Sequence, residues 1–127
     1  MAVAPKMEKS SPEILETFDM IAGWVPEATR KLAFGFPICV INGNMFMGVF
    51  EDEIFLRLEV SLREELIAEF GLAPFEPMPG RAMREYLVLS AELLESAELA
   101  ALVRSAFDYG LSLPAKVPKA QGAKARK

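Results

Sequence analysis

The sequence predicts an α+β domain of two layers, an antiparallel sheet with helices packed on one face, in the order α-β-β-β-α-β(β)-α. Apolar residues recur at helical spacing after residues 11, 61 and 96, and they alternate as in strands between the first two of these segments. The pair Asn42-Gly43 stands between two strand-like segments, where it predicts a two-residue hairpin turn. A chain of 127 residues has the length of one compact domain.

The first helix is predicted to begin at Ser10-Ser11-Pro12-Glu13. Serine accepts backbone N–H bonds at a helix start, proline suits the first turn, and glutamate lies at the positive end of the helix dipole. Gly23 and Pro26 end the helix, and Trp24 and Val25 are expected to cover the core at its exit. Its core-facing stripe consists of Ile14, Leu15, Phe18, Ile21 and Ala22.

Three strands are predicted next. The first runs from Leu32 to Ile41, with Gly35 and Pro37 marking a bend or bulge. The second covers residues 45–50 after the hairpin turn, and the charged residues 51–53 form the following turn. In the third strand, residues 54–60, apolar side chains alternate with Arg57 and Glu59, which is typical of a half-buried strand.

The second half of the chain returns to helical spacing. A capping box at residues 61–64 predicts the start of a helix that ends at Gly71. Residues 73–82 include three prolines and predict a stiff, irregular loop, and residues 83–89 predict a strand. Residues 90–96 predict a turn or short helix, and Ser96 is expected to cap the last helix, which ends before Gly110.

Residues 32–50 carry no charge, so their length alone would allow a membrane-spanning helix. Pro37 and Asn42-Gly43-Asn44 would leave polar groups unsatisfied inside a bilayer, and a β-hairpin is the better interpretation. Phe34-Gly35-Phe36 and Met45-Phe46-Met47 are apolar on both strand faces. Helices can cover one face, and we expect a homodimer to use the other, the alternative being an exposed or self-covered sheet.

The residue inventory argues against an enzyme. The chain has no histidine, which excludes Ser-His-Asp and Cys-His mechanisms and His-ligated metal sites. The one cysteine, Cys39, lies among apolar residues that predict a buried, unreactive thiol. No phosphate-binding glycine motif is present, and residues 51–53 predict a solvated turn rather than a cation site. We expect no cofactor, no metal and, because the chain starts without a secretory signal, a cytoplasmic location.

We expect the chain to have three parts, of which the last differs from the rest in charge. We expect a flexible leader over residues 1–10, the domain over residues 11–113 and a basic, disordered tail over residues 114–127. The tail holds five of the fourteen Lys and Arg residues and no acid, so residues 1–113 carry nine basic against eighteen acidic side chains. Nucleic acid binding by this acidic body is not expected, and only the tail could contact phosphates weakly.

An interaction surface is predicted around a set of exposed aromatic and arginine residues. Arginine grips planar anions with two hydrogen bonds, and Arg81 and Arg84 flank the Pro/Gly-rich segment. The alternative is structural pairing of these arginines with Glu76, Glu85 or the acidic turn, and Tyr86 also fits a core position with its hydroxyl at the rim. The candidate residues are Phe34, Gly35, Arg57, Arg81, Arg84 and Tyr86.

Several segments stand in an order that a known family shares: residues 31–36 (KLAFGF), 42–46 (NGNMF), 56–58 (LRL), 74–81 (PFEPMPGR) and 83–86 (MREY). Over about residues 12–113 the chain resembles the TfoX/Sxy N-terminal domain family. The resemblance implies a helix, a three-strand meander, a helix, two strands and a terminal helix. It also implies kinship with cytoplasmic bacterial regulators of competence for DNA uptake, which carry a second, C-terminal helical domain; we expect this protein to be a stand-alone member without it. It implies no catalytic residues.

These observations favour a non-enzymatic protein that contacts another protein in a regulatory pathway. The alternative is a small-ligand protein whose Arg81 and Arg84 hold an anionic metabolite. An enzyme would have to rely on Asp, Glu, Tyr and Arg chemistry alone.

Overall fold

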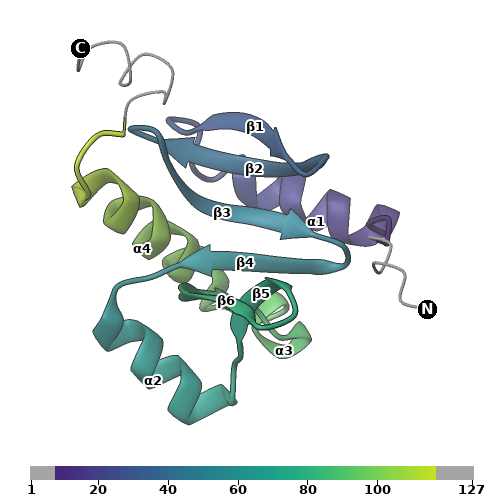
Figure 1. Ribbon diagram of the computed structural model, residues 1–127, viewed down its shortest axis with the longest axis vertical. Coiled ribbons are helices and arrows are strands. Elements are labelled where there is room, and N and C mark those ends of the chain that lie inside the picture. Colours follow the sequence, from purple (N-terminus) through teal and green to yellow (C-terminus); the bar gives the residue numbers. More distant parts are fainter. Residues whose placement is uncertain (1–7, 117–127) are drawn as a thin grey trace.

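One antiparallel sheet with helices forms the structure, which confirms the predicted α+β class (Figure 1). The computed structural model describes residues 8–116, and within them the sheet has six strands in the order β1-β2-β3-β4-β6-β5. The strands are β1 (Thr29–Ala33), β2 (Phe36–Ile41), β3 (Asn44–Phe50), β4 (Glu53–Arg57), β5 (Pro74–Met78) and β6 (Arg81–Val88). The helices are α1 (Pro12–Ala22), α2 (Val60–Phe70), α3 (Ala91–Leu94) and α4 (Leu99–Ser112).

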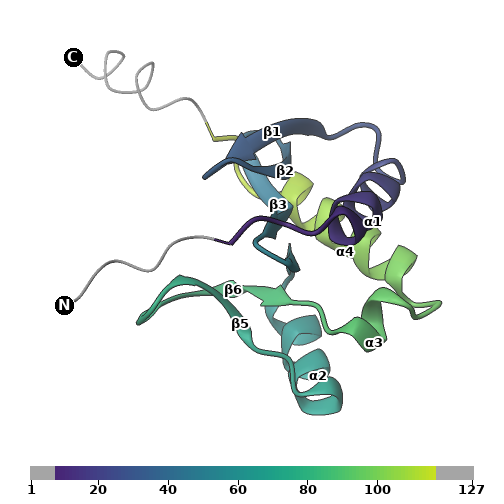
Figure 2. The same cartoon turned by 90° about the vertical axis from the view of Figure 1, so that its right-hand side faces the viewer.

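Helices α1 and α4 lie together on one face of the sheet (Figure 2). Helix α4 packs on β2, β3 and β4, and α1 packs on β3 and β4. The contact is apolar, with Phe18 of α1 fully buried and Phe107 of α4 meeting Phe46 edge-on at 5.6 Å between ring centroids. Each such side chain stabilises the fold by about 1.5–3 kcal/mol through burial. Helix α2 lies apart from this pair and contacts β6.

The opposite face of the sheet is covered by the chain itself. The β5–β6 hairpin bends toward the side away from α1 and α4 (Figure 2). Phe75 of β5 thereby stacks on Phe55 of β4, with 4.1 Å between ring centroids and 13° between ring planes. Phe50 packs edge-on against Phe75 at 5.5 Å, so three rings form a second apolar layer. The sequence left two ways to cover the second apolar face of the sheet, a homodimer or the chain itself. The chain itself covers these three rings, and the homodimer stays a prediction.

The segment predicted as one long strand is two strands joined by a tight turn. Ala33 pairs with Phe36, and the two residues between them have positive φ, 55° at Phe34 and 83° at Gly35. The expectation of a bend or bulge at Gly35 and Pro37 was therefore wrong, because this backbone makes a two-residue hairpin turn. A bulge occurs instead between β2 and β3, where Val40 pairs with Met45 but Cys39 with Met47.

The expectation of an irregular loop over residues 73–82 was also wrong. These residues form β5, a turn and the start of β6. Pro74 and Pro77 are compatible with β5 because it is an edge strand, where a missing N–H breaks no ladder on the open side. The carboxylate of Glu76 accepts a hydrogen bond from the Gly80 N–H at 2.7 Å, which closes the turn.

Helix ends agree with the sequence in part. Ser11 caps α1, because its Oγ accepts a hydrogen bond from the Ile14 N–H at 3.2 Å. The predicted capping box at Ser61 was wrong, since the N-cap of α2 lies two residues earlier, at Glu59, whose carboxylate accepts a hydrogen bond from the Ser61 N–H. Gly110 does not end α4 but lies inside it, where a Cβ would come within 3.0 Å of Ile41 Cγ2. Trp24 was expected to cover the core and is 40% exposed.

Both described ends of the chain are held by turns that flank β3. The Ser11 N–H donates to Asp52 Oδ1 at 2.7 Å, and the Glu8 N–H donates to Glu51 Oε2 at 3.0 Å. At the other end, the Lys116 N–H donates to the Asn42 carbonyl at 2.7 Å. Residues 1–7 and 117–127 lie outside the described part, so most of the predicted leader and tail does too.

Residues 32–50, the uncharged segment, lie mainly in β1, β2 and β3 and the turns between them. A β-hairpin was the correct interpretation of their pattern. Within residues 8–116, no helix combines the length and the apolar composition that a membrane crossing requires.

Two of the turns that contain glycine at positive φ, those of Gly35 and Gly43, offer a matched pair of substitutions. Gly43 has φ 76°, and a Cβ there would lie 2.2 Å from the Lys116 carbonyl oxygen, whereas a Cβ on Gly35 meets nothing within 4 Å. We expect Gly35→Ala to lower the free energy of unfolding by about 1–2 kcal/mol through the left-handed backbone alone. Gly43→Ala should lower the free energy of unfolding by more, because its Cβ must also displace residues 114–116. Urea titration measures both, and equal losses would contradict the contact with Lys116.

Candidate interaction surface

An apolar groove opens between the β1–β2 turn and the β5–β6 hairpin. Its volume is about 160 Å³. The side chains that define it come from elements distant in sequence, Phe34 and Ile38 on one side, Phe50 and Phe55 at the base, and Phe75 and Met83 on the hairpin. Phe75 and Met83 are direct cross-strand partners, which explains why both face the groove.

Phe34 stands at the rim of this groove in an unfavourable position. Its side chain is 68% exposed, although the ring touches Phe50 edge-on at 6.3 Å. Its φ of 55° is rare for a bulky residue, and the corresponding turn position between β2 and β3 holds Asn42 at the same φ. A strained, exposed phenyl group is a reason to suspect function, because folding alone would favour asparagine here.

Two further apolar side chains are exposed near the ends of the same two hairpins. Leu32 of β1 is 72% exposed, and Met78 of β5 is 57% exposed. Sequence reasoning missed Leu32, Met78 and Met83. The signal for Leu32 was available, since it directly follows the charged pair Arg30-Lys31.

Arg57 and Tyr86 form a structural cluster rather than an open site. They are direct cross-strand partners, and the Arg57 guanidinium binds the Glu85 carboxylate, with Nε 2.7 Å and NH2 2.6 Å from Oε1. The guanidinium also lies over the rings of Tyr86 and Tyr109, 5.4 Å and 5.9 Å from their centroids. The Tyr86 hydroxyl donates to the Met45 carbonyl at 3.0 Å. The alternative of structural pairing is therefore confirmed for Arg57.

The charge states of this cluster follow from its surroundings. Burial is the largest influence and works against the charged form of Arg57, but the hydrogen bond that Arg57 donates to Glu85 and the charges of Tyr86, Glu85 and Tyr109 together outweigh it and leave the pKa of Arg57 above its ordinary value. Burial also raises the pKa of the Tyr86 hydroxyl, and the nearby Arg57 charge offsets that only in part. Arg57 stays a cation and Tyr86 a neutral donor, so the cluster fixes β4 to β6.

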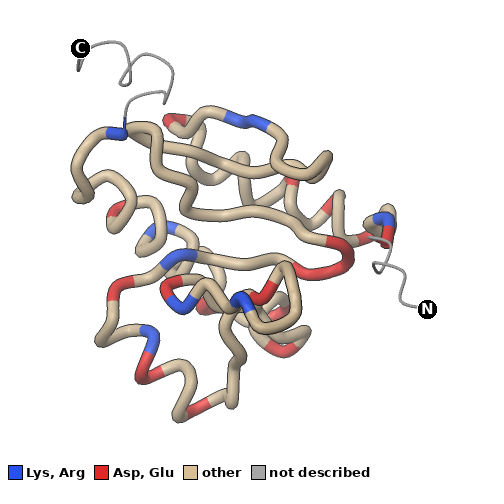
Figure 3. Tube along the Cα trace, viewed as in Figure 1, with Lys and Arg blue, Asp and Glu red and all other residues tan. Residues whose placement is uncertain are grey.

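Arg81 and Arg84 are exposed, unlike Arg57. Within residues 8–116 neither forms an ion pair, and only the main chain of Arg84 is bonded, its carbonyl accepting from Arg63 NH1 at 2.8 Å. The expected pairing with Glu76 or Glu85 does not occur for these two. Basic residues lie along the end of β4, along β6 and at the start of α2, with acidic residues between them (Figure 3).

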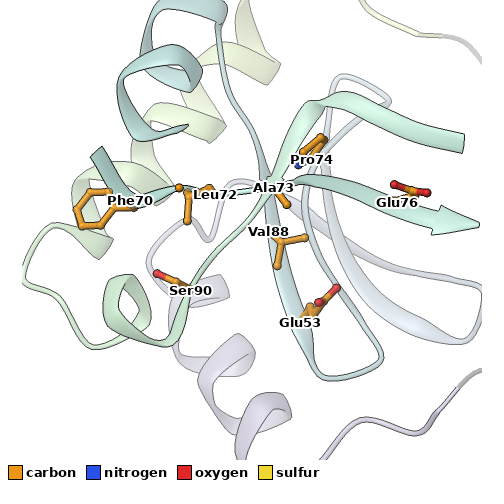
Figure 4. Close-up of a pocket in the computed structure, with 9 residues that line it drawn as sticks. Glu53, Phe70, Leu72, Ala73, Pro74, Glu76, Val88 and Ser90 are labelled. Atoms are coloured by element: carbon orange, nitrogen blue, oxygen red, sulfur yellow. The ribbon is translucent and has the colours of Figure 1, made fainter. Parts of the chain in front are cut away.

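A second hollow lies on the other side of β5, near the end of α2. It has a volume of about 410 Å³, and Figure 4 shows Glu53 near Val88, with Leu72 on one side of Val88 and Glu76 on the other. Burial, and to a lesser degree the Glu51 charge, raises the pKa of Glu53. No group of three Asp, Glu, Cys or His side chains in the described part of the chain is placed to hold a metal ion.

The acidic turn at residues 51–53 has a structural role that sequence reasoning missed. Glu51 and Asp52 accept hydrogen bonds from the backbone just before α1, and the Glu51 carbonyl accepts the Ser10 hydroxyl at 2.6 Å. These contacts orient the entry to α1. Glu51 has φ 54°, so the turn requires a left-handed residue, although it contains no glycine.

Comparison with known proteins gives a single result. A family model described as TfoX N-terminal domain matches residues 12–109. No match appears among curated proteins or among solved structures. The matched range includes every strand and the residues that line the groove.

Removing the Arg57 side chain should destabilise the fold, while removing that of Arg84 should not. We expect Arg57→Ala to lower the free energy of unfolding by about 1–3 kcal/mol, because Glu85 loses its partner and two rings lose a cation. Arg84→Ala, one strand position from Glu85, should change it by less than about 0.5 kcal/mol. Denaturant titrations of both variants make the comparison, and equal losses would contradict a structural role for the cluster.

Cys39 should be unreactive in the folded protein. It is fully buried, and burial raises the pKa of its thiol to about 11. We expect negligible labelling by a disulfide reagent at pH 8 and complete labelling in guanidinium chloride. Because the unfolded thiol ionises near pH ~8.5, its contribution to stability is present below that pH and is lost as the pH rises towards 11. The stability of Cys39→Ala should lack this part of the pH dependence. Rapid labelling of the native wild-type protein would contradict the burial of Cys39.

Proposed function

Since the chain belongs to the TfoX N-terminal domain family, we propose that it is a non-enzymatic interaction module that binds another protein in a regulatory pathway. The observation that carries this proposal is Phe34, a largely exposed phenyl group held at positive φ on the rim of an apolar groove. Exposed apolar side chains around a groove are typical of protein-binding surfaces. Leu32 and Met78 are further exposed apolar side chains on the strands that flank this groove, β1 and β5.

The character of the buried polar groups supports a non-catalytic role. Among the described residues, Asn44 is the one buried polar side chain besides the Tyr86 hydroxyl and the Cys39 thiol, and its Nδ2 donates to the carbonyls of Asn42 and Pro114. An enzyme needs titratable groups that converge on a pocket with perturbed pKa values. The chain also has no histidine to serve as general acid or base near neutral pH.

The finer parts of the proposal come from the family resemblance and from the sequence. We assign the protein to the cytoplasm and to a pathway of the competence-regulator type because the name-giving members of the family act there. A homodimer is proposed as well, because residues 34–36 and 45–47 are apolar on both strand faces. Binding of nucleic acid is confined in this proposal to weak contacts of the basic residues 114–127.

A small anionic ligand is the second candidate function. Arg81 and Arg84 favour it, since both guanidinium groups are exposed and neither forms an ion pair in the described part of the chain. A ligand that binds the folded state stabilises it by mass action, so it should raise the melting temperature. Phosphate, citrate and nucleotides are suitable probes.

The proposal is tested by capture of a partner from cytosolic extract with immobilised wild-type chain and with variants. We expect Phe34→Asn to abolish capture while its melting temperature stays within a few degrees of wild type, because asparagine suits φ 55° better than phenylalanine. The double variant Arg81→Ala/Arg84→Ala should weaken capture in the same way. Bound proteins are identified by mass spectrometry after nuclease treatment.

Arg104→Ala is the matched control. Arg104 is also exposed, but it lies on α4 and pairs with Glu27 and Asp108. Its replacement should leave capture intact. Equal capture by Phe34→Asn and by wild type would exclude the groove as the binding site. If anions raise the melting temperature of the wild type but not that of Arg81→Ala/Arg84→Ala, the ligand function is favoured.

A further inference from the structure

We propose that the groove takes an extended segment of a partner protein in which a bulky apolar side chain is flanked by acidic residues. This inference rests on the proposed function and names the chemistry of its partner. Three features carry it: the size of the groove, the charges on its two rims and the open edge of β1.

The groove is suited to one anchoring side chain rather than to a whole small molecule. Its volume of about 160 Å³ lies below the ~300–1,000 Å³ that is usual for small-molecule sites. The rings of Phe50, Phe55 and Phe75 form most of its base. An aromatic or large aliphatic side chain would bury itself there against the exposed ring of Phe34.

One rim carries Lys31. It pairs directly with Ile38, which lines the groove, and direct partners in an antiparallel ladder share a face. The neighbouring Arg30 confirms the alternation, because its side chain points to the helix face, where it pairs with Asp19 and lies over the ring of Phe18. Lys31 is exposed and forms no ion pair within residues 8–116.

The opposite rim carries Arg81. It lies two residues before Met83 on β6, about 6.6 Å along a strand, at the tip of the β5–β6 hairpin that lines this side of the groove. A cation thus stands on each rim of an apolar groove, in a chain whose net charge is −4. Acidic flanks on the partner would pair with both cations, and lysine or arginine flanks would be repelled.

Strand β1 offers a backbone edge for the same segment. It is the outer strand on its side of the sheet, and its sequence is Thr-Arg-Lys-Leu-Ala. An extended peptide can add to such an edge through main-chain hydrogen bonds. A second copy of β1 is disfavoured, because antiparallel pairing centred on Lys31 would place like charges opposite each other. Residues 1–7 and 117–127 are also unsuited, because they contain lysine and no acid.

The test is selection from a random twelve-residue peptide library displayed on phage, against wild-type chain and against the double variant Lys31→Glu/Arg81→Glu. We expect the wild type to enrich peptides with a Phe, Trp or Leu anchor between Asp or Glu residues. The double variant should enrich the same anchors between Lys or Arg residues. A synthetic peptide from the wild-type selection should bind at least tenfold more weakly to the double variant and to Phe34→Asn, and its affinity for wild type should fall as salt rises.

The outcomes separate this inference from the proposed function. If both proteins enrich peptides with apolar anchors but the charges beside the anchors are the same for the wild type and the double variant, the role of Lys31 and Arg81 is overturned, while binding of an anchor in the groove stands. If the wild type enriches no peptides above background, the extended-segment partner is overturned, and partner capture decides the proposed function independently. Both substituted residues are exposed, and the melting temperature of the double variant shows whether it is folded.

Discussion

The stack of Phe75 on Phe55 is the contact on which the rest of the structure depends. It holds the β5–β6 hairpin against the face of the sheet that the helices leave open. Without it, Phe50 and Phe55 would face water, although both are buried in the single chain. The sheet therefore separates two apolar layers, one formed with α1 and α4 and one formed by aromatic rings. This arrangement explains why the central strands are apolar on both faces and why the chain is rich in phenylalanine.

The bending of the hairpin also creates the groove. Strand β6 pairs with β4 near Tyr86 and with β5 near Met83, and the register between β5 and β6 shifts between these points. Such an irregularity redirects a strand and increases its twist. Arg57, bonded to Glu85 at the place where the register shifts, fixes the geometry. The residues that form the second apolar layer, and so stabilise the fold, therefore also shape the groove beside Phe34.

The sequence predicted the fold correctly at positions where the backbone geometry accepts only a few residue types. Asn42-Gly43 and Ser11 belong to this group, because a left-handed turn and a helix N-cap each favour few residues. The turn at Phe34-Gly35 was missed because a phenylalanine at positive φ contradicts that preference. Strand β5 was missed because prolines indicate loops unless the strand is known to be at an edge. The groove could not be found from sequence, since residues 34–55 meet residues 75–83 only through the bend of the hairpin.

Strand β3 has a mechanical role that follows from the anchoring of the chain ends. The turn before it holds residues 114–116, and the turn after it holds residues 8–11. A force applied between the two ends of the described chain would therefore be transmitted into both ends of one central strand. Such a load acts along β3 and shears its ladders with β2 and β4, which resist together rather than opening one bond at a time. A protease or translocase that pulls on either end would first have to break these contacts with the turns that flank β3.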